Sequence, residues 1–443
     1  MRAKFLMLVV ATVLVFAACS SGSTSPAPSS GGGGGSSPGA TEPATSPGGS
    51  AAPSGSAASG TLDPASVSGS VVISGWRSSP EEGEALTQTL LGFPAVYPNI
   101  HVDYQPIAGD YPTVMVTKIS SHEPPDLFYV NADYTPEWIA QGFLLPLDDY
   151  IAKLGIDTSQ FFDGYLSIFK GKDGKIYGLP KDGNTIALAS NTDIVATAPT
   201  TMDQLVTTAQ GLVGKNGLKA PMCLNPSLDR GLAFIYAQGG SLLNADKTAE
   251  AIDTDASKAA VQWYLDLFKN GLGMTAAQLG DGWCGDALGK GHVAMIFEGG
   301  WLDPAMVGTY PKVKYAWSEM PTGSSGKPVT LSFTVSYSIG TDSANKDQAA
   351  VLLDYLTGKE GMTTWTEGGV ALPSRKDVAA PAGKDVLVKG SDYAQPGSGF
   401  MPGYVDVQKA FQDAFTAQVT KKTYDAGPVV TATAAAITKA LAQ

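Results

Sequence analysis

Hydrophobic positions along most of this chain switch repeatedly between the two-residue period of a strand and the longer period of a helix. The apolar run Val71–Ile73 predicts a short buried strand. Ser79–Glu82 then supplies an N-cap, a first-turn proline and a capping-box glutamate for a helix that we expect to end at Pro94. Alternation over Ile100–Tyr104 and the apolar segment Asp126–Val130 predict two further strands. This order favours an α/β fold with a largely parallel sheet.

Apolar stripes at helical spacing recur later in the chain, over Ala260–Phe268 and over Ala349–Leu356. We assign both stripes to the core. The globular composition extends from about residue 68 to Gln443, and these roughly 375 residues exceed what one hydrophobic core usually supports. Two lobes are therefore expected.

The N-terminus has the pattern of a secretion signal. Arg2 and Lys4 precede an apolar run from Phe5 to Phe16, which is too short to span a bilayer permanently, and small residues then lead to Cys19. The small-small-Cys ending resembles the bacterial lipobox, which implies that residues 1–18 are removed and that Cys19 carries lipid. An ordinary signal peptide with a chance cysteine is the alternative.

A tether is predicted over residues 19–67, which are nearly all Ser, Gly, Pro, Ala and Thr after the cysteine. Such a composition cannot bury enough apolar surface to offset the entropy of ordering, so flexible coil is expected. About 45 residues of this kind span on the order of 35 to 40 Å.

Charge argues against nucleic acid as a partner. The chain has a net charge of −12, and the loss of Arg2 and Lys4 with the signal segment makes it −14. Without clusters of Lys and Arg, an acidic chain gains nothing from phosphate contacts.

Cysteine and histidine positions favour a disulfide and give no support to a metal site. Besides Cys19 the chain has only Cys223 and Cys284, and in an exported protein such a pair more often forms a disulfide than binds metal. His101, His122 and His292 lack metal-ligand spacing, so we interpret them as structural. No metal and no cofactor are expected.

Five short phrases occur in order over about 250 residues: Pro125–Val130 (PDLFYV), Gly142–Asp149 (GFLLPLDD), Gly174–Asp182 (GKIYGLPKD), Gly291–Trp301 (GHVAMIFEGGW) and Gly368–Arg375 (GGVALPSR). Together they resemble the family 1 extracellular solute-binding proteins of ABC importers, a group dominated by sugar binders. Two segments depart from the family pattern. Ala189–Asp193 replaces the usual Tyr-Asn-Lys-Asp phrase, and Pro199–Gln204 replaces Pro-x-Thr-Trp-Asp-Glu. The departures leave the fold unaffected but leave the ligand open.

The resemblance implies a two-lobed periplasmic-binding-protein-like α/β fold with a ligand cleft between the lobes. We place lobe one at residues 68–180 and 330–378, and lobe two at 181–329 and 379–443. Hinge closure would couple occupancy to shape, and the permease of the importer would bind the closed form. The protein would act as a monomer, held by lipid on the outer face of the cell membrane.

Sugar binding needs flat apolar faces for the ring and polar groups for the hydroxyls, and both occur at strand ends and in the family phrases. The candidate ligand-binding residues are Trp76, Arg77, Asn131, Asp133, Tyr134, Asp182, Asn184, Trp283, Glu298, Trp301, Trp365 and Arg375. Each tryptophan could equally be a packing residue, and the two arginines could be surface charges. Trp138 and Trp263 are assigned to packing, and Trp317 is left open.

Two other classes of function are alternatives to the receptor. A lipid-anchored hydrolase acting on glycan would need only two suitably placed carboxylates, but the sequence has no Gly-x-Ser-x-Gly, no His-Glu-x-x-His and no Cys/His pairing. An adhesive surface protein would show internal repeats, and none is visible. The negative charge and the few cations among the candidates favour a neutral carbohydrate as the solute, and the several aromatic candidates suit an oligosaccharide.

Overall fold

The computed structural model describes residues 61–77, 80–369 and 371–442. The signal segment, Cys19, the tether through residue 60 and the expected N-cap at Ser79 lie outside the described residues. Residues 61–67, which composition assigns to the tether, contact the folded body: the Leu62 N–H donates to the Lys153 carbonyl at 3.1 Å, and Val67 is buried.

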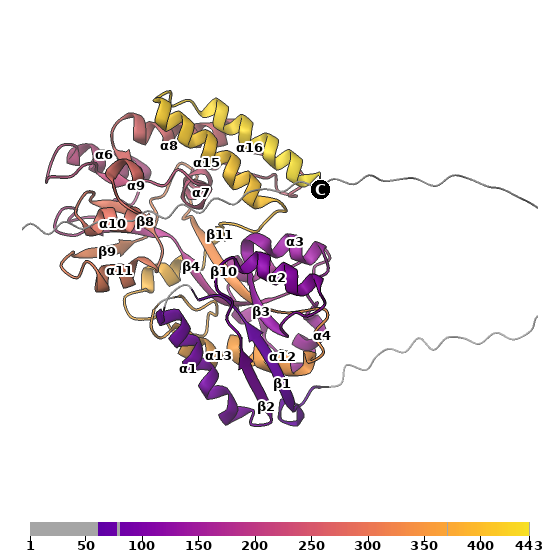
Figure 1. The fold of residues 1–443 in the computed structure, drawn as a ribbon. Helices are drawn as coiled ribbons and strands as arrows, with labels where there is room; N and C mark the ends of the chain where they lie inside the picture. The colour runs from indigo at the N-terminus through magenta and orange to yellow at the C-terminus, as the bar shows by residue number, and fades with distance from the viewer. Residues whose placement is uncertain (1–60, 78–79, 370, 443) are drawn as a thin grey trace, which may run out of the picture. The chain divides into compact units, whose positions relative to one another are not determined.

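Two β-sheets organise the described residues (Figure 1). The first sheet has the order β11-β10-β3-β1-β2, with β4 also paired to β10, and the second has the order β7-β6-β8-β5-β9. The strands of the first sheet are β1 (Gly69–Ser74), β2 (Ile100–Tyr104), β3 (Leu127–Asn131), β4 (Leu179–Thr185), β10 (Thr330–Ile339) and β11 (Ala394–Pro396). Those of the second are β5 (Ala187–Asn191), β6 (Met222–Cys223), β7 (Gly273–Met274), β8 (Met295–Glu298) and β9 (Tyr315–Ser318).

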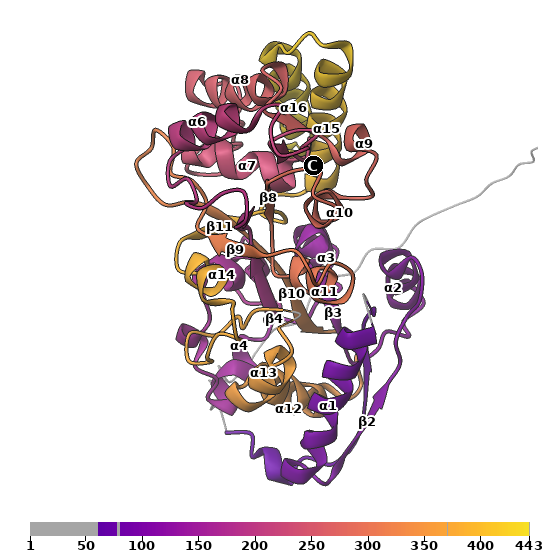
Figure 2. The ribbon, with the colours of Figure 1, turned by 90° about the vertical axis from the view of Figure 1, so that its left-hand side faces the viewer.

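The helices surround these sheets. They are α1 (Pro80–Val96), α2 (Tyr111–Ser120), α3 (Thr135–Ala140), α4 (Asp148–Leu154), α5 (Asp163–Leu166), α6 (Met202–Leu212), α7 (Leu228–Ala237), α8 (Asp255–Lys269), α9 (Ala276–Leu279), α10 (Cys284–Gly289), α11 (Leu302–Gly308), α12 (Lys346–Thr357), α13 (Lys359–Thr366), α14 (Asp385–Gly390), α15 (Tyr404–Lys421) and α16 (Ala426–Leu441). Short 3₁₀ helices are η1 (Pro64–Ser66), η2 (Ala132–Tyr134), η3 (Thr158–Gln160) and η4 (Ser167–Phe169). Helices α8, α15 and α16 lie together at one end of the body, and α1, α12 and α13 lie together at the other (Figure 1 and Figure 2).

The first sheet contains the strands that the sequence predicts, but it is mixed rather than largely parallel. β1 pairs in parallel with β2 and β3, whereas β10 runs antiparallel to both β3 and β4. β10 re-enters this sheet after the chain has passed through the second one, in the direction opposite to β3 and β4. The buried carboxylate of Asp126 accepts the Val72 N–H at 2.8 Å and the Ser343 hydroxyl at 2.7 Å, so it ties β1 to the start of β3 and to the α12 entry.

Helix α1 continues past the proline at which we expected it to end. Pro94 lacks an N–H for the Leu90 carbonyl, but the next turn is kept because the Tyr97 N–H donates to the Phe93 carbonyl at 2.9 Å. A proline so close to a helix end costs one hydrogen bond without breaking the helix.

Each sheet has its own core, and the two-lobed arrangement expected from the family resemblance is confirmed. The Ala349–Leu356 stripe is buried against the first sheet, and the Ala260–Phe268 stripe is buried with α7, α15 and α16 in the second lobe. Beside the second sheet, a disulfide joins Cys223 at the end of β6 to Cys284 at the start of α10. None of the helices in the described residues is both long enough and apolar enough to cross a bilayer.

The chain crosses between the sheets at several neighbouring points. β4 of the first sheet ends at Thr185, and β5 of the second begins at Ala187, so Ile186 alone separates them. A second crossing lies between β9 and β10. Helix α14 packs against β4, β5 and β9 and therefore touches both sheets beside these crossings.

Candidate functional site

A cavity of about 350 Å³ lies where strands of the first sheet meet helices and a turn of the second lobe. The lining residues from the first sheet and the segment after β3 are Asn131, Asp133, Asp182, Asn184, Phe333, Thr334 and Val335. The remaining lining residues are Asp229, Trp301, Ser398 and Gln408.

Five of the candidate residues predicted from sequence line this cavity. Asn131 ends β3, and its side-chain oxygen accepts the Asp133 N–H at 2.9 Å, which holds the following turn. Asp182 and Asn184 are two residues apart on β4 and so lie on the same face of the strand. Trp301 comes from the turn between β8 and α11.

Three carboxyl groups line the cavity. Burial raises the pKa of Asp182, and the neighbouring Lys181 acts in the opposite direction. Asp182 Oδ2 accepts from Lys181 Nζ at 2.7 Å and from Trp365 Nε1 at 3.1 Å, so Oδ1 remains as an acceptor. Burial also raises the pKa of Asp133 and of Asp229; the charge of Asp229 adds to the shift at Asp133.

Two buried acceptors in the cavity wall have no hydrogen-bond partner among the described residues: Asp133 Oδ1 and Asn184 Oδ1. Leaving a buried acceptor unsatisfied costs about 1 to 3 kcal/mol. Since both atoms belong to residues that line a cavity, a solute with hydroxyl or amide donors would remove this cost.

Trp301 provides an aromatic surface to the cavity and is held by a charged pair. Its Nε1 donates to Glu298 Oε2 at 2.8 Å, and the same oxygen accepts from Arg230 at 2.6 Å. The Arg230 guanidinium carbon lies 5.2 Å from the indole centroid, and Phe333 meets the indole edge-on at 6.0 Å. Glu298 does not itself line the cavity, but it fixes the orientation of the indole.

Gly299 is required by space rather than by backbone conformation. A Cβ at this position would lie 2.4 Å from the Trp301 ring, which no real side chain tolerates. Neither Gly299 nor Gly300 has a positive φ. The glycine pair therefore lets the indole fold back over its own turn.

Trp365 supports the cavity from behind Asp182. It is buried at the end of α13, and Lys181 Nζ lies 3.8 Å from its ring centroid and 4.7 Å from that of Tyr129. The ammonium group also lies 3.5 Å from Glu82. Lys181 is thus a buried cation between two aromatic rings and two carboxylates, and it holds one oxygen of Asp182 in place.

Four other candidates lie in packing or surface contacts away from the lining. Trp76 meets Tyr111 and Tyr129 edge-on at 5.0 and 5.2 Å, and the exposed Arg77 lies over the Tyr104 ring. The Tyr134 ring stacks on that of Trp138, with 6.0 Å between centroids. Trp283 precedes α10 and covers Gly285, where a Cβ would meet its ring at 2.3 Å.

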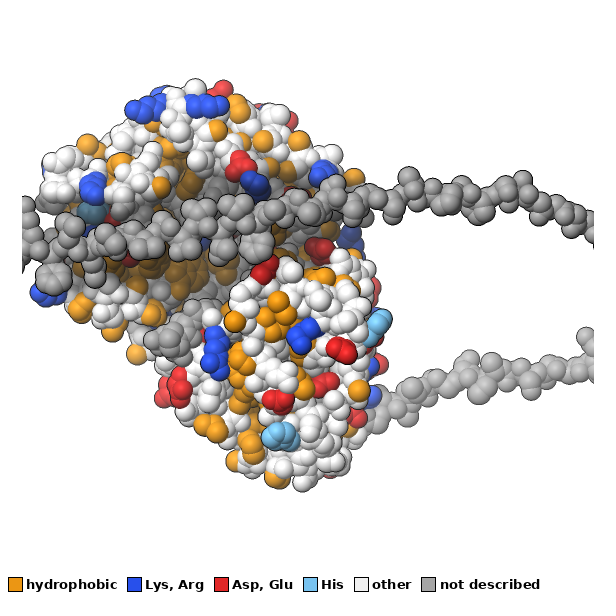
Figure 3. All heavy atoms as spheres, in the orientation of Figure 1, with side chains coloured by type: hydrophobic (Ala, Val, Ile, Leu, Met, Phe, Trp, Pro, Cys, Tyr) orange, Lys and Arg blue, Asp and Glu red, His pale blue; other side chains and the backbone are white. Residues whose placement is uncertain are grey.

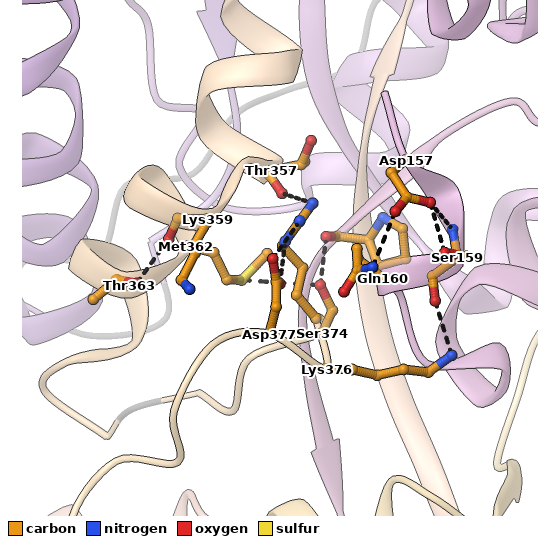
Figure 4. A network of polar contacts seen from close by, with 12 residues as sticks. Asp157, Ser159, Gln160, Thr357, Lys359, Met362, Thr363, Ser374, Lys376 and Asp377 are labelled. Carbon is orange, nitrogen blue, oxygen red and sulfur yellow. Dashed lines mark hydrogen bonds and ion pairs between the residues drawn. The ribbon is translucent and has the colours of Figure 1, made fainter. Parts of the chain in front are cut away.

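Arg375 also belongs to a separate network. Its guanidinium donates to the Asp377 carboxylate at 2.8 and 2.9 Å and to the Thr357 carbonyl at 3.4 Å. Figure 4 shows Asp377 and Thr357 in this network beside Ser374, whose hydroxyl donates to the Pro180 carbonyl at 2.8 Å. These contacts anchor the segment after α13 on the first lobe.

Sequence reasoning missed six lining residues: Asp229, Phe333, Thr334, Val335, Ser398 and Gln408. Asp229 stands in the first turn of α7 and accepts a hydrogen bond from Gln408 of α15. No phrase of the family resemblance covers either helix. β10 contributes three consecutive residues, Phe333 to Val335, so alternation along the strand would not have identified them as lining residues.

The described residues contain no group of His, Cys, Asp and Glu arranged to hold a metal ion. His122 and His292 instead pair with carboxylates, at 2.7 Å from Asp342 and from Asp281 respectively.

The chain is similar to known binding proteins. The family model "Bacterial extracellular solute-binding protein" matches residues 78–363. A protein of Brucella abortus (strain 2308) that is named as a binding protein is 24% identical over 349 residues, which cover 75% of this chain and 82% of that protein.

Two solved structures share the fold. An ABC substrate-binding protein of Listeria monocytogenes, in complex with cycloalternan, superposes with a TM-score of 0.71 at 21% identity and covers 84% of this chain and 99% of its own. The GacH receptor of Streptomyces glaucescens, solved unliganded and with acarbose, gives a TM-score of 0.70 at 22% identity, with 85% and 99% covered.

Proposed function

We propose that this chain, which belongs to the bacterial extracellular solute-binding protein family, is the extracytoplasmic receptor of an ABC importer and binds a neutral carbohydrate in the cavity between its lobes. The observation that carries the proposal is the composition of the cavity wall. It combines the aromatic rings of Trp301 and Phe333 with acceptors that have no partner within the described chain.

The chemistry of this wall suits a sugar. The apolar face of a pyranose ring packs on an indole, and its hydroxyl groups donate hydrogen bonds to carboxylate and amide oxygens. Asp133, Asp182 and Asn184 offer such oxygens, whereas Lys181 and Arg230 are paired with Asp182 and Glu298. A phosphorylated or carboxylated sugar would meet these carboxylates without a lining cation to balance it. The cycloalternan and acarbose bound by the two solved relatives agree with a carbohydrate ligand.

Lobe closure would deliver the solute to the permease. We assign lobe one to residues 68–180 and 330–378 and lobe two to 181–329 and 379–443, except that β4 (Leu179–Thr185) and β11 (Ala394–Pro396) pair within the first sheet and belong with lobe one. Asn131 and Asp133 then come from lobe one, and Asp229, Trp301 and Gln408 come from lobe two. A solute that contacts both sets stabilises the closed form, because only that form offers all of the contacts at once.

The N-terminal sequence supports a location on the outer face of the cell membrane. We assign residues 1–18 to a cleaved signal, Cys19 to lipid attachment and the Gly/Ser/Pro segment that follows to a tether. A tethered monomer would stay near its permease while its lobes open and close. On the face seen in Figure 3, acidic and basic side chains are interspersed, which fits a soluble receptor that does not bind nucleic acid.

The receptor is distinguished from the hydrolase alternative by the fate of the sugar. Members of this family are binding proteins, and the comparisons lend no support to a hydrolase. To test this, the purified protein is incubated with maltose, maltotetraose, acarbose, glucose 6-phosphate and glucuronate. The melting temperature of the protein and the amount of reducing ends released are both measured. If the protein is a receptor, a neutral saccharide raises its melting temperature and is recovered intact. At one hundred times Kd the gain is about 2.7 kcal/mol.

Two results would contradict the proposal. A panel in which only the anionic sugars stabilise the protein would refute a neutral ligand. New reducing ends from maltotetraose would indicate an enzyme. Trp301→Ala, tested beside the wild-type protein, locates any stabilisation in this cavity.

A further inference from the structure

Lys384 is a buried cation just before α14, and it reaches the turn that carries Trp301. Only 3% of the residue is exposed. Its Nζ donates to the Gly300 carbonyl at 3.0 Å and forms an ion pair with Asp303 in the first turn of α11. Since a lysine is seldom buried without a role for its charge, these two contacts define what it does.

Lys384 contacts the turn from Gly299 to Asp303 at two points, in addition to the hydrogen bonds within the turn. Within the turn, the Leu302 N–H donates to the Gly299 carbonyl at 3.0 Å, and the Asp303 N–H donates to that of Gly300 at 3.2 Å. The Asp303 carboxylate is also held by Trp317 Nε1 at 3.1 Å and by the Tyr315 hydroxyl. Lys384 also packs against Gly369 of lobe one, because its Cε lies 3.2 Å from where a Cβ on Gly369 would stand.

The same turn forms part of the cavity wall. A Cβ on Gly300 would lie 3.0 Å from Asn184 Oδ1 and 3.4 Å from Lys384 Nζ, so the turn is held between a lining residue and the lysine. Trp301 follows immediately, and its indole lines the cavity. A small displacement of Gly300 would therefore move the Trp301 indole and also the main chain beside the Asn184 side-chain amide.

We propose that Lys384 is a positioning residue for solute binding: by holding Gly300 and Asp303 it fixes the Trp301 indole in the cavity without lining the cavity itself. This inference rests on the proposed function for its effect on affinity, although its effect on the indole does not require a ligand. Lys384 acts through the main chain of the turn, whereas Glu298 and Arg230 act on the indole directly.

The test compares three single variants. Lys384→Met removes the charge and keeps much of the aliphatic length, and Lys384→Arg restores a cation. Lys389→Met is the matched control, because Lys389 lies on α14, the helix that Lys384 precedes, has a side chain that is 63% exposed and pairs with Glu319 on the surface. The double variant Lys384→Met/Asp303→Asn avoids an unpaired carboxylate if the single variant does not fold.

Two readouts separate positioning from general stability. The first is the near-UV circular dichroism of Trp301 without ligand, taken as the difference between each protein and the same protein carrying Trp301→Phe. We expect this signal to be lost in Lys384→Met and in the double variant, restored in Lys384→Arg and unchanged in Lys389→Met. An unchanged signal in a folded Lys384→Met protein, or in the double variant, overturns the proposal.

The second readout is the affinity for maltotetraose by calorimetry. Since a displaced indole no longer stacks on the sugar, Lys384→Met should weaken binding by up to the loss caused by Trp301→Ala, roughly five- to 150-fold. It should cause no further loss when Trp301 is already Ala. Equal losses in the wild-type and Trp301→Ala backgrounds would overturn the proposal. If the wild-type protein binds no maltotetraose or other saccharide, the carbohydrate function fails, and the circular dichroism alone decides the role of Lys384.

Discussion

Replacing Trp301 by Ala tests the cavity most directly, because the indole is only half-buried in the protein and would be covered by the solute. Stacking a sugar ring on it should contribute about 1 to 3 kcal/mol, as for other apolar side chains that become fully buried. The variant should therefore bind roughly 5 to 150 times more weakly. A fully buried tryptophan would instead cost roughly 3 to 5 kcal/mol of folding stability on truncation.

The hydrogen bond to Glu298 can be separated from stacking with Trp301→Phe. Phenylalanine keeps a flat apolar face but loses the Nε1 donor, and Glu298 still has Arg230 at 2.6 Å as a partner. The Phe variant should thus retain most of the affinity that the Ala variant loses. Trp263→Ala is the control, since that indole packs on Phe234 in the second core, 5.3 Å between ring centroids, and should change stability alone.

Calorimetry with a saccharide found in the thermal panel, and thermal unfolding of the same samples, give the two free energies. Strong destabilisation of the Trp301→Ala protein with unchanged affinity would make Trp301 a packing residue. That outcome would refute the assignment of the cavity as the binding site.

Three further predictions concern other parts of the chain. Burial raises the pKa of Asp133, so its contribution to stability is full below the ordinary value of 3.8 and is lost as the pH rises through the raised pKa. Asp133→Asn should therefore stabilise the unliganded protein at pH 7, lose this advantage in acid and weaken sugar binding. Denaturant unfolding at several pH values tests the effect on stability. The bridge between Cys223 and Cys284, 61 residues apart, should contribute about 4 kcal/mol, measured by unfolding Cys223→Ser/Cys284→Ser, and two free thiols in the unreduced wild-type domain would contradict it. Cys19→Ala should release the protein from membranes or leave the precursor uncut, whereas a processed variant that still sediments with membranes would count against lipidation.

The sequence could predict where the chain turns at the cavity but not which way each side chain points. Trp76 lies just after the end of β1 and Asn131 is the last residue of β3, and these strands are parallel neighbours. Asn131 lines the cavity, whereas Trp76 lies edge-on against Tyr129. Position at a strand end therefore predicts the region, while local packing decides between lining and core.

The lining residues on helices were beyond sequence reasoning for a different reason. Asp229 and Gln408 are 179 residues apart and meet only because α7 and α15 pack together around the second core. In each helix such a residue resembles any polar residue on an exposed face, and nothing in its neighbourhood marks the face that another lobe will cover. The apolar stripes, by contrast, were predicted correctly because burial follows directly from helical spacing.

The strand β4 has a consequence for how fast a solute can leave. It carries Asp182 and Asn184, and one residue, Ile186, separates it from β5 of the other sheet. The carbonyl of Ile186 accepts the Thr330 hydroxyl, and the Thr185 hydroxyl donates to the Leu387 carbonyl at 2.7 Å. Bending at this point would move the acceptors with the crossing, so opening of the lobes and release of the sugar would be coupled through β4. The stiffness of this crossing, together with that of its neighbours, would then contribute to the residence time of the ligand, and substitutions at Thr185 or Thr330 would change dissociation rates without touching the solute.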